Sequence, residues 1–209
     1  MDSHLNTEPL NTENCGEADM RLYVGLVHYP VYNKNHERIA SAVTTLDLHD
    51  LSRIAKTYGV KRLYVITPLE DQQALADRVI RHWTEGYGAK YNPNRKEALE
   101  LICVRASIED CVRDVTEKEG EPPILFTTDA AEKKAVVLGY EEASDMVRAG
   151  KLILLLFGTA WGLGEEVFDR ADYFLDPIRT ETDYNHLSVR SAVAIILDRL
   201  AAGRPRGGQ

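Results

Sequence analysis

The sequence predicts an α/β protein built on a parallel sheet with helices on both faces. Short apolar and β-branched runs alternate with stretches of helical periodicity between residues 21 and 202, which is the pattern of repeated βα units. The run 152–157 is apolar at every position, as expected for a strand covered by helices on both sides. With 209 residues, the chain is long enough to bury a single core without disulfides or metals. We therefore expect one domain over residues 21–202.

The strands are predicted from short runs of apolar and β-branched residues that are bounded by turn residues. Pro122 and Pro123 mark the start of one such run. The run 152–157 is too short to span a membrane. The predicted strands are, in chain order, 21–28, 62–67, 101–104, 124–127, 152–157 and 173–175.

The helices are predicted where apolar residues recur at helical spacing. Leu75, Val79 and Trp83 recur at every fourth position. Gly59 marks the end of the first helix, and Ser107 has a hydroxyl that can cap the start of another. The predicted helices are, in chain order, 46–58, 70–84, 107–118, 140–149, 165–170 and 187–202.

The two ends of the chain differ from the body. Residues 1–20 contain five acids and no Lys or Arg, so we expect a disordered acidic leader, and 203–209 is expected to be a flexible tail. The leader lacks the basic start and apolar stretch of a signal peptide. The cysteines are odd in number and lack metal-ligand spacing, which favours reduced thiols; they are Cys15, Cys103 and Cys111. The sequence therefore predicts a cytoplasmic protein without a membrane segment or a metal site.

The net charge of the chain limits the kinds of molecule that it can bind. The net charge is −8, and the five leader acids leave −3 for residues 21–209. This balance argues against general affinity for nucleic acid but allows a local basic patch. The stretches 28–38 and 86–96 combine basic and aromatic residues, which can pair with phosphate and stack on bases, although ordinary solvated loops have a similar composition. The candidate substrate-binding residues in them are Tyr32, Lys34, Arg38, Lys90, Tyr91 and Arg95.

A glycine loop follows the apolar run, with the sequence Phe157-Gly-Thr-Ala-Trp-Gly-Leu163. Its glycines would let backbone groups approach a small molecule closely, and loops at strand ends line the ligand crevice of parallel sheets. The alternative is a tight strand-to-helix turn that binds nothing.

Two motifs together resemble a known class. The segment Asp176-Pro-Ile178, followed by Tyr184-Asn-His-Leu-Ser-Val-Arg-Ser-Ala192 and an apolar helix, resembles the third motif of the SPOUT class of RNA methyltransferases. The glycine loop resembles the second motif of that class. From about Arg21 to Leu200, the chain resembles a small bacterial family of S-adenosylmethionine-dependent RNA methyltransferases within it. The resemblance implies an α/β-knot fold with a C-terminal trefoil knot, S-adenosyl-L-methionine (SAM) as cofactor, a homodimer, and tRNA or rRNA as acceptor.

The resemblance also implies that three loops hold the cofactor, largely through backbone groups. Ser188 could instead cap the last helix, and Trp161 could pack at a subunit interface. Ala160 stands where the related ribose methyltransferases have a Glu, so no acid is implied in this loop. The residues carried over are Thr127, Thr128, Gly158, Trp161, Gly162, Leu163, Asp176, Ile178, His186, Leu187 and Ser188.

The first predicted helix has a candidate catalytic group. The ribose-methylating branch of the class has an Asn and an Arg six residues apart there; in this chain Asp47 takes the Asn position and Arg53 keeps the Arg. The resemblance implies that Arg53 acts at the acceptor. Asp47 or His49 could accept a proton. The alternatives are a surface ion pair between Asp50 and Arg53 and a surface or interface role for His49.

The sequence thus predicts a SAM-dependent RNA methyltransferase. One alternative is a non-catalytic scaffold of the same fold that binds RNA or a protein. A second is a flavodoxin-type nucleotide-binding protein, although neither a G-x-G-x-x-G nor a P-loop motif occurs. The dimer is also predicted from the apolar residues of the last helix, which exceed what one sheet face needs; they are Val193, Ile196, Leu197 and Leu200.

Overall fold

The computed structural model describes residues 20–128, 137–179, 181–182 and 184–201. The predicted tail, and the leader except Met20, lie outside this part of the chain, as does Cys15. Within it, seven strands form one sheet in the order β5-β4-β1-β8-β6-β9-β7, and all of its pairs are parallel. These strands are β1 (Leu22–Val27), β4 (Arg62–Ile66), β5 (Ile102–Arg105), β6 (Ile124–Thr127), β7 (Val137–Leu138), β8 (Ile153–Gly158) and β9 (Tyr173–Leu175).

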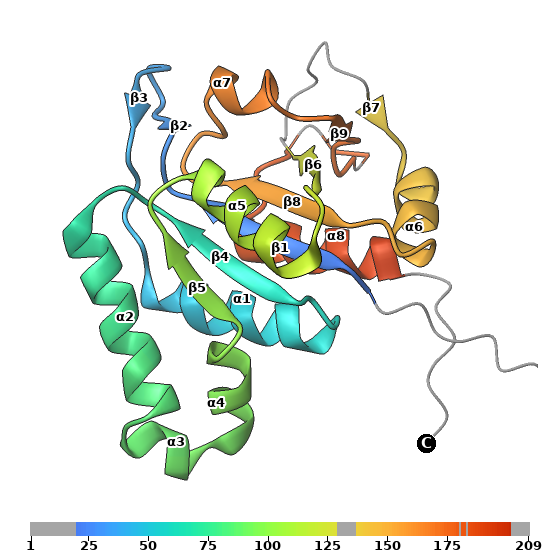
Figure 1. Cartoon of the computed structure of the whole chain (residues 1–209). Helices are drawn as coiled ribbons and strands as arrows, with labels where there is room; N and C mark the ends of the chain where they lie inside the picture. The colour runs from blue at the N-terminus through green and yellow to red at the C-terminus, as the bar shows by residue number, and fades with distance from the viewer. Residues whose placement is uncertain (1–19, 129–136, 180, 183, 202–209) are drawn as a thin grey trace, which may run out of the picture.

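The described helices cover both faces of this sheet, and a separate hairpin projects beyond one edge (Figure 1). The hairpin consists of β2 (Val31–Tyr32) and β3 (Arg38–Ile39), which pair antiparallel. The predicted parallel α/β architecture is confirmed. The helices are α1 (Thr45–Thr57), α2 (Glu70–Thr84), α3 (Tyr87–Tyr91), α4 (Pro93–Leu99), α5 (Ile108–Glu119), α6 (Tyr140–Arg148), α7 (Glu165–Phe168) and α8 (Val189–Ala201).

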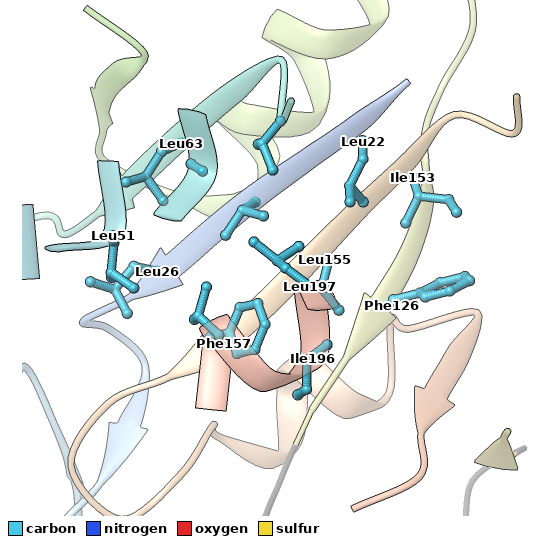
Figure 2. Packing of buried hydrophobic residues seen from close by; sticks show 14 of the residues in the cluster. Leu22, Leu26, Leu51, Leu63, Phe126, Ile153, Leu155, Phe157, Ile196 and Leu197 are labelled. Carbon is cyan, nitrogen blue, oxygen red and sulfur yellow. The ribbon is translucent and has the colours of Figure 1, made fainter. Parts of the chain in front are cut away.

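Strand β8 lies at the centre of two apolar cores. Its alternate side chains point to opposite faces because the side-chain period of a strand is two residues. Leu155 and Phe157 belong to the core under α1, α6 and α8, while Leu154 and Leu156 belong to the core under α5 and α7. Figure 2 shows Leu155 and Phe157 beside Leu197 of α8. The full burial of β8 explains why the run 152–157 has no polar face.

Most predicted elements are confirmed, with ends that differ by one or two residues. Ser107 caps α5 as predicted, since its Oγ accepts a hydrogen bond from the backbone N–H of Asp110. The sequence analysis missed β2, β3, β7, α3 and α4, which are all short. The stretch 86–96, interpreted as a candidate loop, contains α3 and most of α4. The sheet order also differs from the 2-1-3-4-5 order of flavodoxin-type proteins, so that alternative is wrong.

No helix in the described ranges is long and apolar enough to cross a membrane. Across the same residues, no group of three or more His, Cys, Asp or Glu side chains is arranged to hold a metal ion. Cys103 and Cys111 are free thiols that are buried in the core.

Candidate functional site

A cavity of about 880 Å³ opens at the carboxyl edge of the sheet, beyond the ends of β8 and β9. This volume lies in the range of about 300–1,000 Å³ that is usual for small-molecule sites. Three segments that are far apart in the sequence form its walls, namely 157–162, 176–178 and 185–192. The start of α1, the segment before it, Thr128 and Ile196 complete the lining. The cavity lies where ligands bind in open parallel sheets.

The glycine loop forms one wall of this cavity and depends on its glycines. Gly162 has a φ of +103°, a conformation that residues with a side chain rarely adopt. A Cβ on Gly158 would lie 2.8 Å from the backbone N of Leu163, so the loop can fold back only over a residue without a side chain. The loop therefore exposes backbone to the cavity at two places.

The β2–β3 hairpin holds the glycine loop from outside. The backbone N–H of Tyr32 donates to the carbonyl of Gly162, and the N–H of Trp161 donates to the carbonyl of Tyr32, both at 3.0 Å. The N–H of Gly164 donates to the carbonyl of Pro30, also at 3.0 Å. The stretch 28–38 thus includes a structural support for the cavity wall.

A chain of side-chain hydrogen bonds, from partly buried hydroxyl groups to a buried imidazole, joins the same two segments. Thr159 Oγ1 donates to the carbonyl of Val27 at 2.9 Å and lies 2.5 Å from Ser41 Oγ, which lies 2.9 Å from His28 Nδ1. Because the Thr159 hydroxyl donates to Val27, the Ser41 hydroxyl donates to Thr159, and His28 Nδ1–H donates to Ser41. His28 is fully buried, and burial lowers the pKa of its imidazole to about 4. The imidazole is therefore neutral near pH 7.

Two carboxylates of α1 and an arginine of α8 form a charged cluster beside the cavity. Arg190 of α8 donates from Nη1 to Asp47 Oδ1 at 2.7 Å, and its Nε lies 3.2 Å from Asp50 Oδ2. The hydroxyl of Thr44 donates to Asp47 Oδ2 at 2.6 Å. The side chain of Asp47 is 8% exposed, so its charge needs these partners. The sequence analysis missed Arg190, although it lies inside the quoted motif, because its partner is 143 residues away.

A second cavity, of about 560 Å³, lies between α1 and α8 and shares Ser188 and Arg190 with the first. Arg53 lines this outer groove and not the inner cavity. Within the described residues, Arg53 forms no ion pair with Asp50, whose partner is Arg190. The alternative of a surface pair between Asp50 and Arg53 is therefore wrong, and Arg53 is left facing the groove.

The structure brings most of the predicted cofactor residues together around the inner cavity. Thr127 and Leu163 are exceptions: both are buried and lie outside its lining. Ser188 caps α8, since its Oγ accepts from the N–H of Ser191 at 3.3 Å, and it also lines both cavities. Trp161 is 64% exposed at the lining. The predicted cofactor residues in the lining are Thr128, Gly158, Trp161, Gly162, Asp176, Ile178, His186, Leu187 and Ser188.

His49 lies away from both cavity linings. Its ring packs edge-on against Trp83, with ring centroids 5.4 Å apart. Burial, together with the nearby charge of Arg95, lowers the pKa of the His49 imidazole. Among the described residues, its Nδ1 has no hydrogen-bond partner.

The predicted substrate-binding residues fall into two separate groups. Tyr32, Lys34 and Arg38 are on the β2–β3 hairpin, where Arg38 pairs with Glu166 at 3.0 Å. Lys90, Tyr91 and Arg95 are on α3 and α4. The two groups lie at opposite ends of the molecule (Figure 1), so they cannot form one continuous surface.

The residues around the inner cavity suit an adenosine-containing sulfonium cofactor. Apolar side chains of Phe157, Ile178 and Leu187 line the cavity, as a purine ring requires. The glycine loop brings backbone N–H and C=O groups to the same lining, and Asp176 supplies a carboxylate. SAM thus fits this donor set.

Comparison with known proteins identifies relatives of this chain. Residues 21–202 match the model of a family described as SAM-dependent RNA methyltransferases. A tRNA (guanine-N(1)-)-methyltransferase of Oleidesulfovibrio alaskensis is 45% identical over 179 residues, which are 86% of this chain and 41% of that protein. An uncharacterized protein of Aquifex aeolicus is 35% identical over 86% of this chain and 87% of its own length. The chain thus spans about two fifths of the named relative.

Solved structures share the fold at low sequence identity. A methylase-family protein from Neisseria gonorrhoeae superposes with a TM-score of 0.60 at 13% identity, covering 90% of this chain and 85% of that one. The SpoU methyltransferase AviRb from Streptomyces viridochromogenes, in complex with AdoMet, gives a TM-score of 0.54 at 17% identity and covers 90% of this chain and 61% of that one. The parallel sheet of this chain therefore has the fold of the SpoU methyltransferases.

Proposed function

This chain belongs to the family of SAM-dependent RNA methyltransferases, and from this membership we propose that it transfers the methyl group of SAM to a nucleotide of tRNA. The observation that carries the proposal is the cavity at the carboxyl edge of the sheet, walled by a glycine loop and by two segments from the last part of the chain. Its position, size and apolar lining suit a nucleoside ligand.

The glycine loop and the segments 176–178 and 186–188 would hold the cofactor. When bound, SAM supplies an electrophilic methyl group on a positively charged sulfur. Asp176 would offset that positive charge, while the backbone of Gly158 and Gly162 would contact the adenosine. Thr127 and Leu163 would act indirectly, by fixing the buried ends of β6 and of the glycine loop.

The protein's own contribution to the reaction is to place an acceptor atom in line with the methyl group and to take up the proton that it loses. We assign proton uptake to Asp47, which lines the cavity. Arg53, in the outer groove, would stabilise negative charge on the acceptor nucleotide. His49 would have a positioning role, by packing α1 against Trp83. On the hairpin, Tyr32, Lys34 and Arg38 would contact RNA beside the cavity.

The name of the curated relative does not fix the acceptor atom. Methylation at guanine N1 is assigned to proteins of which this chain matches about two fifths, and their remaining length could carry that activity. We therefore propose tRNA as the acceptor class and leave the methylated atom to the assay below.

We further propose the trefoil knot, a homodimer and a cytoplasmic location. In support of the knot, β8 inserts between the earlier strands β1 and β6, and α8 packs against both α1 and α6. In support of the dimer, two apolar side chains of the cavity lining are exposed, namely Trp161 at 64% and Leu187 at 46%. The apolar residues of the last helix do not supply this surface, contrary to the sequence-based expectation, because they are buried within the chain; they are Val193, Ile196, Leu197 and Leu200. A cytoplasmic location follows from tRNA as substrate.

The test is transfer of tritiated methyl groups from SAM to tRNA and to rRNA from cells that lack the protein, followed by digestion to nucleosides. We expect incorporation into tRNA by the wild type. Arg53→Ala should lower it about a hundredfold, as expected when one charge-stabilising group is lost at a transition state, while SAM affinity stays within twofold. Lys151→Gln, an exposed change away from the site, is the matched control. SAM binding without transfer to either RNA would instead favour the non-catalytic scaffold.

A further inference from the structure

The end of α2 together with α3 and the start of α4 forms a basic and aromatic projection, residues 78–96, which we call the helical tip. It carries Arg78, Arg81, Lys90, Arg95 and Lys96 against a single acid, Glu85, in a chain whose net charge is −8. Within the described residues, none of Arg78, Arg81, Lys90 and Arg95 pairs with a carboxylate. The tip therefore has uncompensated positive charge.

The acids that follow the tip cancel only one of these charges. Glu100 lies 3.7 Å from Lys96, while Glu97 lies 3.6 Å from Lys56 of α1. Among the residues that the structure describes, the other four cations of the tip keep their charge unpaired. Arg78, Arg81 and Lys90 are exposed to solvent, where they are free to meet phosphate groups.

Two tyrosines of α3 form an exposed aromatic surface among these cations. Tyr87 is 74% exposed and Tyr91 is 73% exposed. Their rings stack on each other, with centroids 6.2 Å apart and an interplanar angle of 21°. Neither ring belongs to the two apolar cores. The pair is therefore available to a ligand with a flat face.

Trp83 fixes this surface in place. The guanidinium of Arg95 lies 4.6 Å from the centroid of the Trp83 ring, and the ring of His49 packs against it from α1. A Cβ on Gly88 would lie 2.6 Å from Trp83 Cε3, so α3 lies directly on the indole. The tyrosine pair is thus preorganised, which lowers the entropy lost on binding.

No residue of the tip lines either cavity. Helix α2 starts at the carboxyl edge of the sheet, after β4, and its 15 residues carry the chain back by roughly 22 Å. Figure 1 accordingly shows α3 at the opposite end of the molecule from the hairpin that supports the glycine loop. The two tyrosines therefore line neither the cofactor cavity nor the groove that holds Arg53.

We propose that the helical tip binds unpaired nucleotides of the substrate RNA at a second site, away from methyl transfer. Stacking on Tyr87 and Tyr91 would hold the bases, and Arg81 and Lys90 would hold the phosphates, which is how proteins bind single strands without base-specific contacts. The inference rests on the proposed function, because the ligand is the RNA that is methylated. It assigns the tip to RNA affinity and not to the chemical step.

The test measures the affinity of the full chain for tRNA by fluorescence anisotropy at several salt concentrations, without cofactor. Tyr87→Ala with Tyr91→Ala should weaken binding about tenfold, within the range of losing a stacked base. Tyr87→Phe with Tyr91→Phe keeps the stacking faces and should bind within twofold of the wild type. Lys90→Ala should weaken binding and should lower the slope of log affinity against log salt concentration by about one, the value for one lost phosphate contact. Lys151→Ala should change neither the affinity nor the slope.

Kinetics separate this site from the reaction centre. In the transfer assay, the double alanine variant should raise KM for tRNA and keep kcat, and its affinity for SAM should equal that of the wild type. Unchanged RNA affinity, or a fall in kcat at saturating tRNA, would overturn the inference. If the wild type transfers no methyl group but the tip variants still lose RNA binding, the RNA-binding role of the tip is supported and the proposed methyltransferase function is contradicted.

Discussion

The buried carboxylate of Asp47 requires partners for its charge. A carboxylate that is 8% exposed is costly unless it is paired and hydrogen-bonded, and Arg190 and Thr44 provide both kinds of contact. The sequence could suggest Asp47, because its position on a predicted helix is local information. It could not suggest Arg190 as its partner, because that pairing depends on how α8 crosses α1.

The Asp47–Arg190 pair should therefore show measurable coupling. In a double-mutant cycle with Asp47→Asn and Arg190→Gln, urea unfolding should give a coupling free energy of about 1–3 kcal/mol, because Arg190→Gln leaves the buried Asp47 carboxylate without its cation. The matched cycle with Asp50→Asn should give under about 1 kcal/mol, since that carboxylate is about half exposed. Equal coupling in the two cycles would contradict the distinction between them.

His28 should make stability depend on pH. Burial lowers the pKa of its imidazole to about 4 from the usual 6.5, so below pH 6.5 the unfolded chain takes up a proton that the folded chain does not. Stability should fall as the pH drops from about 6.5 to about 4, by on the order of 3 kcal/mol from this group.

The comparison variant for this titration is His28→Asn, which has no titrating group at this position. It should be less stable at pH 7, because the bond to Ser41 changes, but its stability should fall less steeply between pH 6.5 and 4. The measurement is urea unfolding at half-unit pH steps. Parallel pH profiles for the two proteins would show that His28 is not the group responsible.

At the scale of elements, the hairpin and the glycine loop behave as one unit. Three backbone hydrogen bonds and the chain from His28 through Ser41 to Thr159 join them. The long elements could be predicted because their apolar periodicity is local and strong. The hairpin could not, since two-residue strands carry almost no pattern and its main partner is the loop more than 120 residues later.

The hydroxyl of Thr159 should matter for cofactor binding. Thr159→Val removes the bond to the carbonyl of Val27 and the contact with Ser41, which should loosen the cavity wall and weaken SAM binding about five- to tenfold. Thr159→Ser keeps the hydroxyl and should bind within twofold of the wild type. Thr116→Val, the same change on α5, is the control. Calorimetric titration measures all four proteins, and equal affinities for Thr159→Val and the wild type would contradict the coupling.

At the scale of the whole molecule, the site is walled by segments from three separate parts of the chain. The sequence indicated nine of the cavity residues through motif resemblance, but it could not place Arg53 outside the inner cavity or the tip at the far end. Both depend on packing. The exposed side chains around the cavity remain to be covered, which motivates the proposed dimer.

The dimer has a direct test. Sedimentation velocity at micromolar concentration should give twice the chain mass of 23.5 kDa for the wild type. Trp161→Arg with Leu187→Arg should shift the protein toward the monomer, because both side chains are exposed in the single chain and a charge opposes burial at an interface. A monomeric wild type would contradict the proposal.

The most direct test of the whole account is calorimetric titration of SAM into the wild type, Gly162→Val and Ala192→Leu. The wild type should bind one SAM per chain. Gly162→Val should bind at least tenfold more weakly, about 1.4 kcal/mol, because valine is strained at φ +103° and obstructs the backbone. Ala192→Leu fills the cavity from α8 without backbone strain and should also weaken SAM binding at least tenfold. Circular dichroism should confirm that both variants are folded. Absence of binding by the wild type, or unchanged affinity in both folded variants, would contradict the assignment of this cavity to SAM.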